Sequence, residues 1–133
     1  MKTHVIRLTY GNDLKESIKQ YCIQNNIQAA TILSSVGCLY EVNIRLAGGK
    51  DYYKNSKEYE IISLNGTVSI NGIHLHISLS DIKGDMVGGH LENGCFVNTT
   101  CELILLELED VIFTREFDEK TGYKELVVKS VEF

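Results

Sequence analysis

Three of the four histidines in this 133-residue chain lie between positions 74 and 90, at spacings that suit metal chemistry. His74 and His76 alternate with apolar residues, and His90 follows after a glycine-rich return. Because successive side chains of a strand point to opposite faces, the first two imidazoles share one face, about 6.5–7 Å apart. Three protein nitrogens with an open fourth position are typical of a catalytic zinc site. The spacing therefore predicts a metal site at His74, His76 and His90.

The same residues also have a simpler interpretation, which the sequence leaves open. A His-x-His pair can be the polar face of a half-exposed strand, and His90 can be a loop residue bonded to a carbonyl. Ser78 and Ser80 share that polar face and fit either interpretation. Zinc is the first metal to expect, but imidazole also suits copper, nickel and iron.

Composition indicates one ordinary globular domain over residues 1–133. Apolar residues make up 44% of the chain and charged residues 23%. No apolar run approaches the roughly 18 residues that span a bilayer, and the early charges do not fit an export signal. The cysteines form no Cys-x-x-Cys pair, which favours free thiols in a reducing compartment. We therefore expect a cytoplasmic protein that makes no membrane contact.

Charge weighs against direct contact with DNA. The formal net charge is −5, whereas a module that grips duplex phosphates usually carries a basic face. The only lysine-leaning segment, residues 50–57, contains Asp51 and is followed by Glu58 and Glu60. This composition therefore favours a solvated loop over a surface that binds nucleic acid.

One helix is expected at about residues 13–25. Asp13 can cap it, and Glu16 three residues later completes a capping-box pattern. Apolar side chains then recur at helical spacing and form a stripe that packs on a sheet. That stripe consists of Leu14, Ile18, Tyr21 and Cys22.

The rest of the chain predicts about eight strands. Residues 27–35 and 38–46 are expected as two strands with a break at Val36 and Gly37. Asn71-Gly72 predicts a hairpin, and residues 118–122 predict the turn of a terminal hairpin. The expected fold class is α+β, a strongly bent, mostly antiparallel sheet or partial barrel with the one main helix packed against it.

With these elements placed, the chain resembles the plant and prokaryote conserved (PPC) domain, some plant members of which carry DNA-binding AT-hooks. Residues 60–67, 74–79 and 88–91 carry the resemblance most specifically, supported by residues 11–14, 34–37 and 121–126 and by Arg45. The resemblance implies an α+β fold, a homotrimer and, in prokaryotic members, a metal-binding cluster that maps onto the three histidines. The fold also resembles that of acetolactate decarboxylase, which holds zinc with a His-x-His pair and a later histidine. The AT-hook is absent here.

Three hypotheses follow. The first is a zinc-dependent enzyme of lyase or hydrolase type acting on a small oxygen-rich molecule, with Arg45 as an anion clamp and Glu102 or Asp81 as acid–base groups. Each helper has an alternative, since Arg45 fits an exposed polar strand face and Glu102 a subunit interface. The second is a regulatory, DNA-associated protein that acts through partners or a trimer surface. The third is a structural interaction module whose function is trimerisation.

Overall fold

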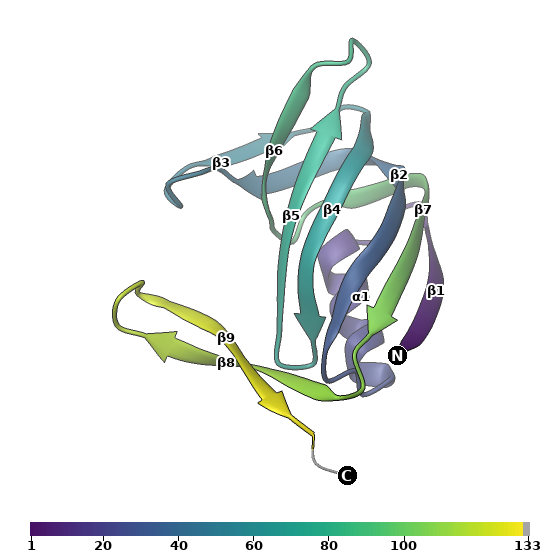
Figure 1. Cartoon of the computed structure of the whole chain (residues 1–133). Helices are drawn as coiled ribbons and strands as arrows, with labels where there is room; N and C mark the ends of the chain where they lie inside the picture. The colour runs from purple at the N-terminus through teal and green to yellow at the C-terminus, as the bar shows by residue number, and fades with distance from the viewer. Residues whose placement is uncertain (132–133) are drawn as a thin grey trace.

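The structure, a computed structural model, describes residues 1–131, which form one helix and nine strands. Helix α1 spans Leu14–Gln24. The strands are β1 Lys2–Thr9, β2 Ala30–Arg45, β3 Tyr52–Asn55, β4 Tyr59–Ser69, β5 Gly72–Ser80, β6 Met86–Leu91, β7 Phe96–Glu107, β8 Val111–Asp118 and β9 Tyr123–Ser130. This arrangement confirms the expected α+β class (Figure 1). No helix within residues 1–131 is long and apolar enough to cross a membrane.

Seven strands form one antiparallel sheet that bends round on itself. The order is β1-β7-β2-β4-β5-β6, with β3 paired to β2. The far end of β2 also pairs with β6, through Ile44 opposite Leu91 and Arg45 opposite His90. Strands β2, β4, β5 and β6 therefore close a ring, which confirms the predicted strong bend. Strands β8 and β9 form a separate two-stranded sheet, which packs against the ring through Phe113 and Arg115 (Figure 1).

Helix α1 begins as the sequence predicts. The Asp13 carboxylate accepts a hydrogen bond from the Glu16 backbone N–H at 3.0 Å, which satisfies one free donor of the first turn. Leu14, Ile18 and Cys22 are fully buried, so the predicted apolar stripe is the face that packs inward. Burial of this face, more than intrinsic propensity, holds so short a helix in place.

Strand β5 shows the predicted alternation. Leu75, Ile77 and Leu79 are buried in the core, whereas His74 and His76 are exposed on the other face. The inward row anchors the strand, because burying each such side chain stabilises the fold by about 1.5–3 kcal/mol. The register of the two histidines is fixed by this anchor, since a slip of one residue would bury them.

The structure corrects two expectations about strands. Strand β2 is continuous from residue 30 to residue 45, with bulges rather than a break near Gly37, because both of its edges are paired. A side chain at position 37 would collide with the Thr100 carbonyl, so glycine there allows close packing of the two strands. Part of the expected solvated loop is strand β3, which pairs antiparallel with residues 42–45.

Candidate metal centre

The three clustered histidines meet at one point on the outer face of the ring. One ring nitrogen from each of His74, His76 and His90 lies within 4.8 Å of the other two. The ring centroids are 5.1 Å apart for residues 74 and 76, 5.2 Å for 74 and 90, and 5.8 Å for 76 and 90. Small rotations about side-chain bonds would let all three nitrogens reach one zinc ion placed among them, at the N–Zn distance of roughly 2.0–2.1 Å that is usual for imidazole.

Strand register brings His90 to the pair on β5. His76 lies directly opposite His90 across β5 and β6, and Arg45 lies opposite His90 across β2 and β6. Directly opposed residues point to the same face, so this row is shared by three strands. Gly89 permits the closure, because a Cβ there would lie 2.5 Å from the Arg45 carbonyl oxygen. Of the predicted glycine-rich return, Gly88 and Gly89 are part of strand β6 itself, whereas Gly84 lies in the loop before it.

Glycine is also required behind His74. Gly66 adopts a φ of +149°, and a Cβ at this position would collide with the backbone carbonyl of His74. The two strands therefore approach one another closely at this site. The position of His74 depends on a neighbouring residue that has no side chain.

The electrostatics of the cluster favour neutral imidazoles. Burial, followed by the positive charge of Arg45, lowers the pKa of His90 to about 4. Burial, followed by the charge of Arg115, also lowers the pKa of His74. Because a metal binds the deprotonated ring, the lowered pKa values of His74 and His90 favour the ligating form of these two residues. The donor set therefore fits a borderline divalent cation such as zinc.

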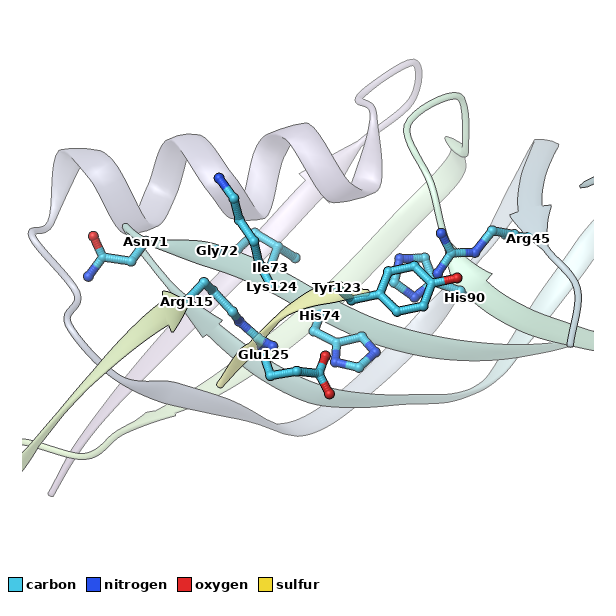
Figure 2. Close-up of a pocket in the computed structure, with 10 residues that line it drawn as sticks. All are labelled: Arg45, Asn71, Gly72, Ile73, His74, His90, Arg115, Tyr123, Lys124 and Glu125. Carbon is cyan, nitrogen blue, oxygen red and sulfur yellow. The ribbon is translucent and has the colours of Figure 1, made fainter. Parts of the chain in front are cut away.

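A cleft of about 430 Å³ opens beside the histidines, between the ring and the β8–β9 hairpin (Figure 2). A second cleft of about 560 Å³ adjoins the same cluster on the side of the loop at residues 46–49. The first is lined by Arg45, Asn71, Gly72, Ile73, His74, His90, Arg115, Tyr123, Lys124 and Glu125. The cluster is therefore accessible to a small molecule.

Of the three helpers suggested by the sequence, only Arg45 lies at the cluster. Its guanidinium carbon lies 5.8 Å from the centroid of the Tyr123 ring, within range of a cation–π contact. Glu102 is an exposed residue of β7, opposite Arg7 on β1 and Val36 on β2, and lines neither cleft.

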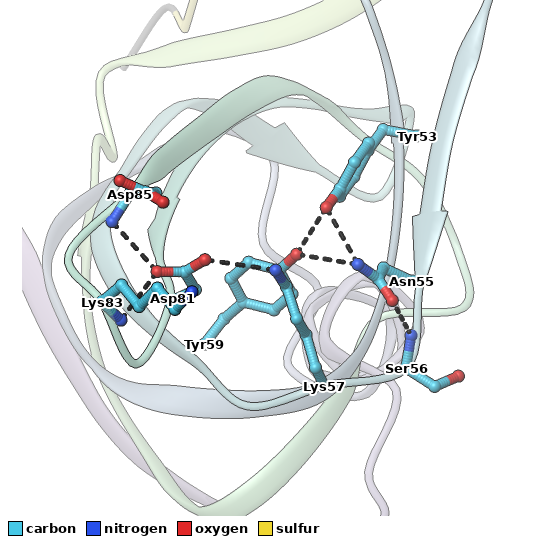
Figure 3. Close-up of polar contacts among 8 residues, drawn as sticks. All are labelled: Tyr53, Asn55, Ser56, Lys57, Tyr59, Asp81, Lys83 and Asp85. Carbon is cyan, nitrogen blue, oxygen red and sulfur yellow. Dashed lines mark hydrogen bonds and ion pairs between the residues drawn. The ribbon is translucent and has the colours of Figure 1, made fainter.

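Asp81 lies in a different polar network (Figure 3). Its carboxylate pairs with Lys57 at 3.1 Å and accepts backbone N–H bonds from Lys83 at 2.9 Å and Asp85 at 3.0 Å. These bonds shape the tight loop between β5 and β6. The nearby cleft of about 240 Å³ contains no histidine.

Sequence reasoning missed the carboxylates that do lie at the cluster. Glu125 of β9 lines the cleft beside His74, as Figure 2 shows, and a Glu92 oxygen lies 3.8 Å from Nε2 of His90. Glu92 could have been found, because it is two residues from His90 in the sequence. Residues 121–126 supported the family resemblance, but no local pattern assigns Tyr123, Glu125 or Arg115 to the site, because their place depends on how the hairpin docks.

Comparison with known proteins supplies a family match and two closely similar structures. The model of the Plants and Prokaryotes Conserved (PCC) domain matches residues 1–109. A hypothetical protein from Salmonella cholerae-suis is 37% identical, with a TM-score of 0.94 over 97% of this chain and 94% of that one. The protein AF0104 from Archaeoglobus fulgidus, described as metal-containing, is 32% identical, with a TM-score of 0.80 over 96% of this chain and 94% of that one.

More distant or partial matches add less. A protein from Bacteroides thetaiotaomicron, described as a candidate DNA-binding protein, has a TM-score of 0.84 over 94% of this chain and 91% of that one. At 18% identity this likeness shows the fold alone. A curated relative, the bifunctional protein GlmU of Synechococcus sp. strain JA-3-3Ab, is 37% identical over 98% of this chain. The chain spans only 21% of the length of that relative.

Proposed function

Because this chain belongs to the Plants and Prokaryotes Conserved domain family, we propose that it is a metal-dependent domain acting on a small oxygen-rich molecule. His74, His76 and His90 hold one divalent cation, with zinc as the first choice. The observation that carries the proposal is the convergence of the three ring nitrogens within 4.8 Å on the face of the ring that adjoins an open cleft. The metal content described for the archaeal protein, which is 32% identical, supports it.

A cation held by three imidazoles supplies Lewis acidity, which polarises a carbonyl or lowers the pKa of a bound water. The chain itself positions the ligand. Arg45 and Arg115 orient an anionic group, and the Tyr123 ring forms part of the wall. The Glu125 carboxylate, beside His74, is the group placed to accept or return a proton.

Metal analysis of untagged protein tests this proposal. We expect about one equivalent of zinc per chain after incubation with zinc and removal of the excess. His90→Ala should lower the affinity for zinc by more than about 100-fold, because it removes a direct ligand, whereas loss of a residue that only orients a ligand costs roughly 10–100-fold. His4→Gln is the matched control, because it removes the one histidine outside the cluster. Equal zinc in all three proteins, or none in the wild type, would refute the proposal.

We also propose that the chain assembles as a homotrimer. Large apolar side chains are exposed on strands β1, β2 and β4. Their accessible fractions are 78% for Val5, 58% for Leu33, 55% for Val36 and 55% for Ile62. Symmetric closure would bury such surface. Light scattering should give three times the chain mass of 15.0 kDa, and Val36→Lys should shift it toward one chain. A wild-type mass of a single chain would contradict this assembly.

A further inference from the structure

The arginines of this chain are concentrated at one place. The sequence contains three, and two of them, Arg45 and Arg115, line the cleft beside the histidines. Within residues 1–131 neither forms an ion pair with a carboxylate. Two guanidinium groups that lack a carboxylate partner and share one cleft provide donors for an anion from outside.

A hydrogen bond to the sheet holds the Arg115 side chain in place. Its Nη2 donates a hydrogen bond to the Thr67 hydroxyl at 2.8 Å, and Thr67 lies opposite His74 across β4 and β5. The guanidinium therefore lies beside the histidine cluster. A guanidinium carries five N–H donors, and this bond uses only one, so the rest of the fork remains available.

Arg45 approaches the same cluster from the opposite side. It lies across from His90 in the strand register, and the Tyr123 ring supports its guanidinium. Two positioned forks thus flank the metal ligands, one from strand β2 and one from the β8–β9 hairpin. Arginine suits this task because its planar fork matches carboxylate and phosphate oxygens.

The charge and size of the cleft indicate the class of ligand. Arg45, Arg115 and Lys124 contribute three positive charges against one negative charge from Glu125, in a chain whose net charge is −5. The volume of about 430 Å³ lies within the range of small-molecule sites, roughly 300–1,000 Å³.

We infer that this cleft binds a small molecule bearing a carboxylate or phosphate group, which the forks of Arg45 and Arg115 clamp while its remaining oxygens face the three histidines. The inference rests on the proposed metal site and deepens it by naming the ligand class. It also assigns a role to the hairpin. Arg115 lies beyond residues 1–109, the part that the family model matches, so this half of the clamp comes from outside the matched region.

Titration calorimetry on the full chain tests the inference with two probes, inorganic phosphate and malonate, which separate the two sources of the anion. At least one probe should bind the zinc-loaded wild type. Arg115→Gln and Arg45→Gln should each weaken binding about 10–100-fold, the typical cost of a hydrogen bond to a charged group. Arg7→Gln, which removes the only arginine outside the cleft, should leave binding unchanged. Arg45→Lys should restore part of the affinity because it keeps the charge.

Metal content, measured on the same samples, separates this inference from the proposed function. The arginine variants should keep their zinc, so a loss of anion binding alone identifies the clamp. His76→Ala should lose zinc but retain weaker anion binding, because both arginines remain. Binding that is equal in Arg115→Gln and Arg7→Gln, or absent for both probes in a zinc-loaded wild type, would overturn the clamp while leaving the metal site intact.

Discussion

The two histidine environments of this protein differ in what they leave unsatisfied. His4 is buried, and its two ring nitrogens lie 2.8 Å from the Tyr21 hydroxyl and 2.7 Å from a Glu107 oxygen. Within residues 1–131, no ring nitrogen of His74, His76 or His90 has a hydrogen-bond partner. The same residue type is used once as a closed structural element and three times as an open set of donors.

This contrast indicates where function should be sought. A buried polar group that finds all its partners stabilises the fold, and little remains for it to bind. Three imidazoles that face one another without a hydrogen bond have lone pairs to offer, and burial, followed by nearby positive charge, lowers the pKa of His90 and of His74. Changes at the first site should therefore affect stability, whereas changes at the second should affect ligands.

The largest effect on stability is expected at His4. His4→Ala removes both hydrogen bonds and leaves the polar groups of Tyr21 and Glu107 without this partner. The free energy of unfolding should therefore fall by about 2–4 kcal/mol. In metal-free protein, His76→Ala should change it by less than about 0.5 kcal/mol, because the side chain is exposed. Urea denaturation of both variants measures the difference. Equal losses would erase the distinction between the two sites.

Zinc should reverse that ranking. At a free concentration 100 times its Kd, a ligand that binds only the folded state raises the unfolding free energy by about 2.7 kcal/mol. We expect this gain in the wild type and in His4→Gln, but not in His76→Ala. Thermal unfolding with and without zinc, at one protein concentration, provides the measurement. A comparable rise in His76→Ala would place the bound metal elsewhere.

The four cysteine thiols also differ in how deeply they are buried. Burial raises the pKa of Cys22, Cys95 and Cys101 to about 11, so almost no reactive thiolate exists there at pH 8. Cys38 is only half-buried. Ellman's reagent at pH 8 should therefore modify one thiol per chain in the native protein and four after unfolding. Rapid reaction of three or more native thiols would show that the core opens readily.

The smallest effect is expected at the loop between β5 and β6. The Lys83 backbone N–H, followed by Lys57, lowers the pKa of Asp81. The resulting stabilisation is present above the ordinary carboxyl pKa and is lost as the pH falls through the lowered one. Asp81→Asn should thus reduce the Tm slightly at pH 7 and not at strongly acidic pH, with zinc content unchanged. A loss of zinc would instead tie Asp81 to the metal site.

Local patterns were enough to predict much of the fold and the clustering of His74, His76 and His90. The helix after Asp13 and the alternation in β5 depend on residues a few positions apart, and both are confirmed. The continuity of β2 could not be predicted, because it depends on pairing with β7 and β4 across long sequence separations.

The rest of the site escaped prediction for a similar reason. Arg115 and Glu125 reach the cleft only because the hairpin docks beside β5, and no pattern within residues 111–130 encodes that contact. The arginine on β2 was singled out, but its neighbour Tyr123 was not. Site residues supplied by a separate hairpin are visible only once the tertiary arrangement is known.

X-ray absorption at the zinc edge tests the central claim most directly. In the zinc-loaded wild type and in His4→Gln, we predict three imidazole nitrogens at about 2.0–2.1 Å from the zinc, with the remaining position taken by oxygen. The imidazole signal should decrease in His90→Ala. A zinc environment dominated by sulfur, or one that is identical in His90→Ala and the wild type, would contradict the claim that His74, His76 and His90 form a single metal site.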